Sequence, residues 1–231
     1  DVDRDWVPNG PDSAYYLRPL VFATEERMGL KSSDEFLFMV MGGPFRPLFA
    51  KPLRVKVERE YSRAAPGGTG FAKCAGNYAA AMYPTQMAKE QGFDQVLWTD
   101  AFTHQHIEES GAMNVAFVID DVVVTPPLSD TILDGVTRAS VLELARELGY
   151  AVEERTVDVA ELADGIEGGS VTEAFGVGTA ASIAPIETIS IDGVDHTLKI
   201  DESAKMFELR RRLNAIRFGE TTDTHSWMTT I

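Results

Sequence analysis

A single lysine, Lys73, stands between two glycine-rich turns in the run Pro66-Gly67-Gly68-Thr69-Gly70-Phe71-Ala72-Lys73-Cys74-Ala75-Gly76-Asn77-Tyr78. No other charged residue lies within nine positions on either side. A lysine among small residues is a candidate for burial, and an apolar pocket disfavours the ammonium form. An unprotonated amine is a nucleophile that can form a Schiff base with an aldehyde. A surface turn with an incidental lysine fits the same residues, so this segment alone leaves both interpretations open.

Two adjacent acids, Glu108 and Glu109, stand inside an otherwise apolar run. Neighbouring side chains of a strand point to opposite faces, so one acid can be solvated while the other points inward. A buried carboxylate needs a cationic or hydrogen-bonding partner, and a protonated heteroaromatic nitrogen would serve. A strand edge that carries two solvated acids is the alternative.

Two further segments could bind a phosphate or a carboxylate. Residues 133–138 open a predicted helix, where free backbone N–H groups bind anions and the Thr137 hydroxyl adds a donor. A helix that is simply capped by Asp134 is the alternative. Residues 176–181, Gly-Val-Gly-Thr-Ala-Ala, offer exposed amides and one hydroxyl, or form only a tight turn. They lack the third glycine of a dinucleotide-binding fingerprint.

Composition and missing motifs exclude several other classes of protein. The 231 residues carry a net charge of -15, which argues against a nucleic-acid partner. Cys74 is the only cysteine, so an internal disulfide is impossible. His104 and His106 lie near Glu108, but no third ligand of the right type is evident, so we expect no metal site. There is no Gly-x-Ser-x-Gly elbow of a serine hydrolase.

The elements that must position these residues mix hairpins with helices. The pattern predicts an α+β fold with mixed or antiparallel sheet and flanking helices. Strands are expected over 15–24, 36–40, 53–57, 95–99, 107–120, 122–125, 151–157, 171–175, 183–191 and 196–200, and helices over 76–91, 137–148, 159–164 and 204–218. Pro84 lies inside the first helix, so we expect a kink or a restart there. No stretch has the length of a membrane span and no signal peptide is recognisable, which favours a cytoplasmic protein.

In their order and spacing, these segments resemble the branched-chain amino-acid aminotransferases, within the class IV pyridoxal-phosphate enzymes of fold type IV. The resemblance runs over nearly the whole chain. The residues that carry it are Tyr16-Leu17-Arg18-Pro19, Gly67-Gly68-Thr69-Gly70, Lys73, Gly76-Asn77-Tyr78, Glu109 to Asn114, Thr125-Pro126, Gly135-Val136-Thr137-Arg138, Glu173-Ala174-Phe175-Gly176, Gly178-Thr179-Ala180-Ala181 and Trp227-Met228.

The resemblance implies a role for each matching residue toward the cofactor pyridoxal 5'-phosphate. Lys73 would bind it as a Schiff base and shuttle the proton between substrate Cα and cofactor C4′. Glu109 would keep the pyridinium nitrogen protonated, and Tyr78 would hydrogen-bond the phenolic oxygen. The remaining cofactor contacts would come from Val136, Thr137 and Thr179 at the phosphate and from Leu133 and Gly135 at the ring.

The resemblance also implies a substrate site. The turn at Thr179-Ala180 would present amides to the substrate α-carboxylate, with Gly178 and Ala112 beside it. Tyr16 and Arg18 would lie at the side-chain pocket, where Arg18 helps to accept the second carboxylate of glutamate.

The implied activity is reversible transamination of leucine, isoleucine and valine with 2-oxoglutarate by a homodimer. A D-amino-acid aminotransferase, an aminodeoxychorismate lyase and an inactive truncated scaffold are the alternatives. We expect residues 1–13 to be an interdomain linker and 14–231 to be the large cofactor-binding domain, with the family's small N-terminal domain absent from this chain. Two departures stand out: Ala116 replaces a usual aromatic residue, and Ala181 and Ala184 replace the Cys-x-x-Cys pair of the mammalian enzymes.

Overall fold

The computed structural model describes residues 3–8, 13–45 and 51–229. The chain divides into two compact units, 1–48 and 49–231, which are described separately below. The predicted linker over 1–13 and the predicted domain over 14–231 stay predictions, and the division between the compact units falls after residue 48.

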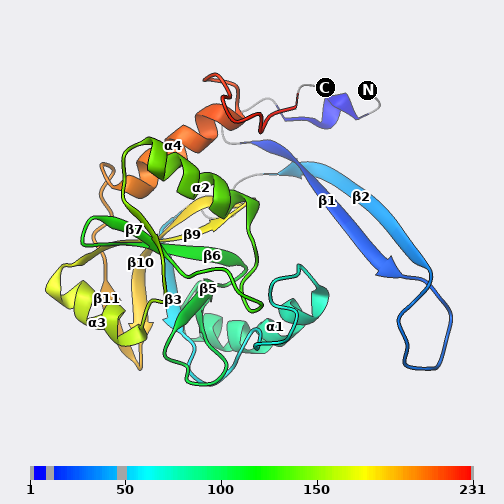
Figure 1. Cartoon of the computed structure of the whole chain (residues 1–231), viewed down its shortest axis with the longest axis horizontal. Coiled ribbons are helices and arrows are strands. Elements are labelled where there is room, and N and C mark those ends of the chain that lie inside the picture. The colour runs from blue at the N-terminus through cyan, green and yellow to red at the C-terminus, as the bar shows by residue number, and fades with distance from the viewer. Residues whose placement is uncertain (1–2, 9–12, 46–50, 230–231) are drawn as a thin grey trace. The chain divides into compact units, whose positions relative to one another are not determined.

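The described part of the first unit is a short 3-10 helix and one antiparallel hairpin. The helix η1 spans Arg4–Trp6, and strand β1 (Ala14–Ala23) pairs with β2 (Phe36–Phe45) from Ala14 opposite Phe45 to Ala23 opposite Phe36 (Figure 1). Both strands were expected from the sequence, and β2 runs further than predicted, through Gly42 and Gly43.

The described part of the second unit is built around one mixed sheet. Its strand order is β11-β10-β3-β4-β5-β6-β7-β8, and β9 pairs with β10 and β6. The strands are β3 (Leu53–Val57), β4 (Gln95–Thr99), β5 (Ile107–Ser110), β6 (Met113–Ile119), β7 (Val122–Thr125), β8 (Val152–Glu154), β9 (Val171–Gly178), β10 (Ser182–Ile191) and β11 (Val194–Thr197). Most neighbours are antiparallel, while β3 is parallel to β4 and β10, and β7 is parallel to β8. The predicted α+β class with a mixed sheet is confirmed.

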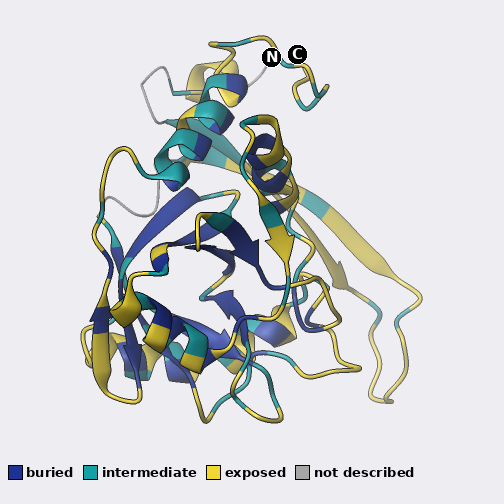
Figure 2. Cartoon of the chain, turned by 60° about the vertical axis from the view of Figure 1, so that its left-hand side comes forward, coloured by how far each residue is buried: buried dark blue, intermediate teal, exposed yellow. Residues whose placement is uncertain are grey.

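Four helices of this described region cover the sheet: α1 (Ala75–Glu90), α2 (Val136–Glu147), α3 (Val159–Gly168) and α4 (Lys205–Arg217). The buried residues form two large clusters. One includes Leu162 of α3, and the other includes Leu142 of α2 and Leu209 of α4. A smaller cluster joins Ala88 of α1 to Trp98 of β4. Strands β4, β5, β6 and β7 are almost continuously buried, as the dark blue strands of Figure 2 show, which gives the site a rigid base.

Two sequence predictions concern elements that carry the site, and the structure differs from the first and from part of the second. The expected single strand over 107–120 is a hairpin of β5 and β6, because Gly111 adopts a positive φ of 57° and turns the chain. Of the kink or restart expected at Pro84, the restart does not occur, because α1 is one helix from Ala75 to Glu90 with Pro84 buried inside it.

Candidate active site

Lys73 lies in the loop that leads into α1, and the Asn77 side chain shapes that loop. Asn77 Nδ2 donates to the carbonyl oxygens of Thr69 and Ala72 at 2.7 and 2.8 Å, and Thr69 Oγ1 donates to Asn77 Oδ1 at 2.9 Å. Lys73 Nζ donates to the Tyr78 hydroxyl at 3.1 Å. The Asn77 hydrogen bonds therefore fix the backbone that carries Lys73, and the Tyr78 hydroxyl lies beside the Lys73 amine.

Of the two interpretations that the sequence left open for Lys73, burial does not hold, because its side chain is exposed. The small residues around it let the loop run along the surface, and they provide no side chain large enough to cover the amine. The amine is accessible to a ligand from solvent.

Glu109 is the buried acid of the site, and the β5–β6 hairpin positions it. It pairs with Asn114 across the hairpin and is 3% exposed. Its Oε1 accepts the Leu133 N–H at 2.7 Å and lies 3.4 Å from Asn114 Nδ2, while Arg63 Nε lies 3.3 Å from Oε2. Burial raises the pKa of Glu109 to about 7, although the charge of Arg63 and the Leu133 hydrogen bond oppose that rise.

Glu108 is buried as well, so the sequence-based possibility that one of the two acids is solvated does not hold. Its Oε1 accepts a 2.6 Å hydrogen bond from the Thr131 hydroxyl, because the loop before α2 folds over the strand end. Burial raises the pKa of Glu108 too, against the hydrogen bond from Thr131 and the charge of Arg63. Two neighbouring buried carboxylates thus face one guanidinium.

Sequence reasoning missed two residues of this network, Arg63 and Asn114. Arg63 is buried, donates to the carbonyl oxygens of Gly70 and Thr131, and so ties the lysine loop to the loop before α2. Its only signal in the sequence is an arginine at the start of the uncharged segment around Lys73. Asn114 Nδ2 donates to the Leu133 carbonyl oxygen at 2.8 Å, and its signal is its place at the end of the motif that begins at Glu109.

The two predicted anion-binding segments meet at the N-terminus of α2. Gly135 is the N-cap, no side chain caps the helix, and its first turn holds no acidic residue. The simple Asp134 cap is therefore not formed. Thr137 Oγ1 and Thr179 Oγ1 lie 3.5 Å apart, which places two hydroxyls beside the uncapped amides. A helix start with this arrangement binds an anion well.

The other predicted site residues fall into two groups. In the second unit, Leu133, Gly135, Gly178 and Ala180 are half-buried, while Ala112, Val136 and Thr179 are exposed. Gly135 is closely packed, since a Cβ there would collide with Asn114 Oδ1. In the first unit, the Arg18 guanidinium carbon lies 5.2 Å from the centroid of the Tyr16 ring. The roles of all these residues toward a cofactor or substrate stay predictions.

The donor set fits pyridoxal phosphate. An accessible amine suits its aldehyde, a buried acid with a raised pKa suits its ring nitrogen, and an uncapped helix start with two hydroxyls suits its phosphate. Each group comes from a different part of the chain, and the loop contacts through Arg63 and Asn114 join them.

Comparison with known proteins places the chain in a family. The model of the family "Amino-transferase class IV" matches residues 4–189. The chain belongs to this family of class IV aminotransferases.

Among individual proteins, a probable branched-chain-amino-acid aminotransferase of Staphylococcus epidermidis is 41% identical over 98% of this chain. Branched-chain-amino-acid transaminase 1 of Bacillus subtilis is also 41% identical over 98% of the chain. The chain spans 65% of the length of each of these two relatives.

Solved structures agree with the fold. A branched-chain aminotransferase from the archaeon Thermoproteus uzoniensis, solved with norvaline, superposes with a TM-score of 0.81 at 27% identity, over 93% of this chain and 68% of that one. A branched-chain amino acid aminotransferase from Escherichia coli gives a TM-score of 0.75 at 26% identity, over 94% of this chain and 69% of that one. The fold-type-IV architecture is therefore shared.

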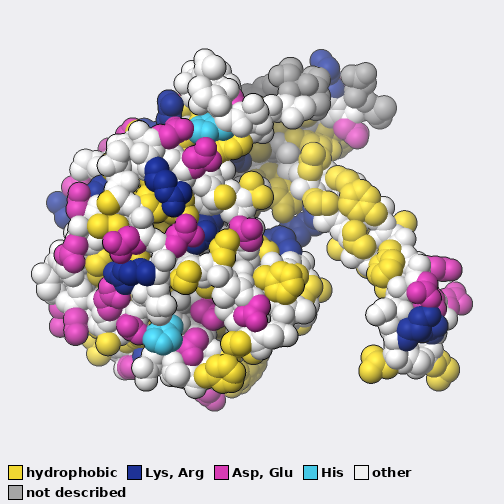
Figure 3. Space-filling view, in the orientation of Figure 1, with side chains coloured by type: hydrophobic (Ala, Val, Ile, Leu, Met, Phe, Trp, Pro, Cys, Tyr) yellow, Lys and Arg dark blue, Asp and Glu magenta, His cyan; other side chains and the backbone are white. Residues whose placement is uncertain are grey.

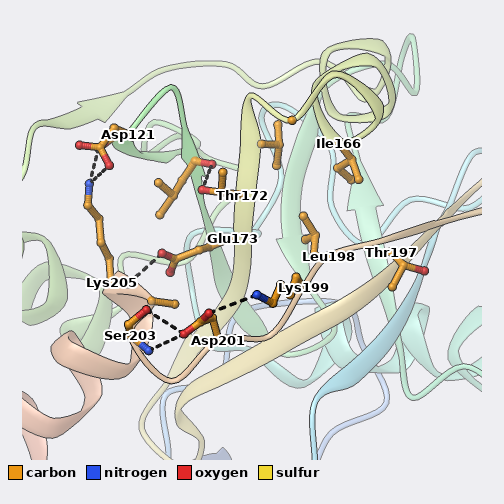
Figure 4. Close-up of a pocket in the computed structure, with 14 residues that line it drawn as sticks. Asp121, Ile166, Thr172, Glu173, Thr197, Leu198, Lys199, Asp201, Ser203 and Lys205 are labelled. Carbon is orange, nitrogen blue, oxygen red and sulfur yellow. Dashed lines mark hydrogen bonds and ion pairs between the residues drawn. The ribbon is translucent and has the colours of Figure 1, made fainter.

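A separate pocket lies between β9, β11 and the start of α4 (Figure 4), and it contains none of the predicted site residues. Its charged side chains are occupied with one another or with the backbone. Lys205 pairs with Asp121 and Lys199 with Asp201, while Glu173 accepts the backbone N–H groups of Lys205 and Met206. The described residues that line this pocket therefore offer a ligand no unpaired charge.

The part of the chain that the structure describes holds no helix long and apolar enough to span a membrane.

Proposed function

We propose that this chain is the cofactor-binding part of a pyridoxal-phosphate-dependent branched-chain aminotransferase. The reaction is transfer of the amino group of leucine, isoleucine or valine to 2-oxoglutarate, which gives the branched-chain 2-oxo acid and L-glutamate. The observation that carries the proposal is the convergence of Lys73, Glu109 and the α2 N-terminus through one network. The names of the 41% identical relatives support the substrate class.

Pyridoxal phosphate, when bound, supplies an electrophilic aldehyde and a ring that accepts the electrons of a substrate carbanion. This chain supplies the groups that bind and orient it. The amides and hydroxyls around Thr137 and Thr179 hold the phosphate, and Glu109 holds a proton at the ring nitrogen as a carboxylate partner. Tyr78 orients the ring through its phenolic oxygen. Arg63 holds the Glu109 carboxylate in position through the 3.3 Å contact between Arg63 Nε and Glu109 Oε2.

Lys73 has the second task of moving a proton. Its Nζ, hydrogen-bonded to Tyr78, would take the proton from the substrate Cα and deliver it to the cofactor carbon C4′. The backbone amides at Thr179-Ala180 would receive the substrate carboxylate. A homodimer and a cytoplasmic location belong to the same proposal.

Turnover assays with L-leucine, D-alanine and aminodeoxychorismate on the complete protein test the proposal. We expect amino transfer from L-leucine to 2-oxoglutarate and none from D-alanine. Turnover of D-alanine or aminodeoxychorismate without turnover of L-leucine would show that the protein has another activity found within fold type IV. If the protein binds the cofactor but shows none of the three activities, the inactive scaffold is the remaining interpretation.

A further inference from the structure

Away from the candidate active site, a second group of side chains comes together at the far end of α2. Glu143 and Glu147 stand one turn apart on that helix, and His225 reaches them from the C-terminal segment. One ligand atom from each residue lies within 4.8 Å of the others. Thr137 and Glu147 are separated by about 15 Å along the helix axis, so this group is distinct from the proposed phosphate site.

The C-terminal segment holds the His225 ring in place. Its side chain is 6% exposed and stacks on Trp227, with ring centroids 4.0 Å apart and planes 14° apart. Asp223 accepts the backbone N–H groups of His225 and Met228 at 2.9 and 2.8 Å. Trp227 also packs against the core cluster that contains Leu142 of α2. The imidazole is thus preorganised by contacts that do not involve the two glutamates.

The two nitrogens of the ring have different surroundings. Nδ1 lies 3.1 Å from Glu143 Oε1 in a hydrogen bond, so this nitrogen carries the hydrogen in the neutral ring. Nε2 is buried, makes no hydrogen bond to a described residue, and lies 3.3 Å from Glu147 Oε1. In the neutral ring the Nε2 lone pair therefore faces a carboxylate oxygen, and a metal ion bound between these two atoms would stabilise the arrangement.

The separation of these two atoms suits a metal ion. Ligands about 2.0–2.2 Å from a tetrahedral ion are about 3.3–3.6 Å from one another, and the 3.3 Å between Nε2 and Oε1 lies at the short end of that range. A metal-bound histidine commonly donates its other ring N–H to a carboxylate, and Glu143 is placed to accept it. Mixed nitrogen and oxygen donors favour zinc-like ions over calcium or magnesium.

We propose that His225 Nε2 and Glu147 bind a zinc-class divalent cation, with Glu143 orienting the ring and water completing the coordination. The ion fastens the C-terminal segment to α2. No sequence pattern indicated this site, because His225 lies far along the chain from the two glutamates and only the fold brings them together. The acidic side chains spread over the visible surface favour cation binding in general (Figure 3).

Zinc titration of purified, chelator-stripped protein without a histidine tag tests the site. We expect one saturable Zn²⁺ per chain by calorimetry, with a rise in Tm on binding. His225→Gln and Glu147→Gln should each abolish that binding and the Tm rise, and Glu143→Gln should weaken binding about 10- to 100-fold. The matched control is His106→Gln, which removes an imidazole paired with Asp158 at 2.7 Å and should leave zinc binding unchanged.

Glu147→Gln changes a partly exposed helix residue, so it keeps the test valid if His225→Gln fails to fold. Wild-type protein that shows no saturable zinc binding would overturn the proposal. Equal zinc binding by wild type and Glu147→Gln would overturn it as well, because the zinc would then bind at another place. Neither result depends on cofactor binding or on transaminase activity.

Discussion

Replacement of Glu109 by glutamine should change how the stability of the cofactor-free protein depends on pH. The folded-state pKa of Glu109 is raised from 4.5 to about 7, so folding favours the protonated carboxyl. Its stabilising effect is fully present below pH 4.5 and is lost as the pH rises through about 7. A shift of this size corresponds to a loss on the order of 3 kcal/mol in the free energy of unfolding.

Glu109→Gln keeps the shape of the side chain but cannot ionise, so it should not suffer this loss. Below about pH 7 Arg63 faces a neutral group in both proteins, so the variant loses no ion pair there, and the effect of Arg63 above that pH is already contained in the folded-state pKa. The free energy of unfolding of the variant, relative to wild type, should therefore rise by on the order of 3 kcal/mol between about pH 4.5 and about pH 8.

Urea unfolding of both proteins at a series of pH values measures this difference. Glu202→Gln, at an exposed position, is the control and should show a much smaller change. A difference between Glu109→Gln and wild type that stays constant with pH would refute the reasoning, because it would mean that Glu109 ionises in the folded protein as easily as in the unfolded chain. Added pyridoxal phosphate should stabilise wild type more than the variant, since the carboxylate then has a cationic partner.

Three further predictions concern the site and the assembly. Thr137→Val with Thr179→Val removes two hydroxyls from the α2 N-terminus and should weaken pyridoxal phosphate binding at least tenfold in a fluorescence titration, since a hydrogen bond to a charged group contributes about 1.5–3 kcal/mol. Unchanged affinity would place the phosphate elsewhere. Gly135→Ala drives a Cβ into Asn114 Oδ1 and should lower the Tm and the cofactor affinity together. The control is Gly149→Asn, which should leave both nearly unchanged, because Gly149 has no close neighbours and asparagine tolerates its positive φ. Sedimentation of the complete protein should show a homodimer, and a monomer at working concentrations would contradict the family expectation.

The sequence predicted the elements of this fold well where local patterns decide them. The turn signals and alternating runs placed β3, β4, β7 and α2 within a residue or so of their observed bounds. It failed at Gly111, because an apolar run on both sides hides a turn that only the glycine backbone reveals. The length of β8 was also overestimated, since its pairing with β7 ends at Glu154.

The site was predictable only in its parts. The residue types around Lys73 and the helix start at Thr137 indicated an amine and an anion site, but their meeting depends on contacts between distant loops. Arg63 reaches the Thr131 carbonyl oxygen across 68 positions, and no local pattern encodes that contact. The exposure of Lys73 was likewise unpredictable, because small neighbours are compatible with either burial or an open loop.

The most direct test of the proposed function is to locate the covalent attachment of the cofactor. Purified protein is incubated with pyridoxal phosphate, reduced with borohydride, digested and analysed by mass spectrometry, with Lys73→Ala treated in parallel. The proposal predicts a visible absorption band before reduction and one phosphopyridoxyl group on the peptide that contains Lys73, both lost in the variant. A label on another lysine, or a band that persists in Lys73→Ala, would contradict it.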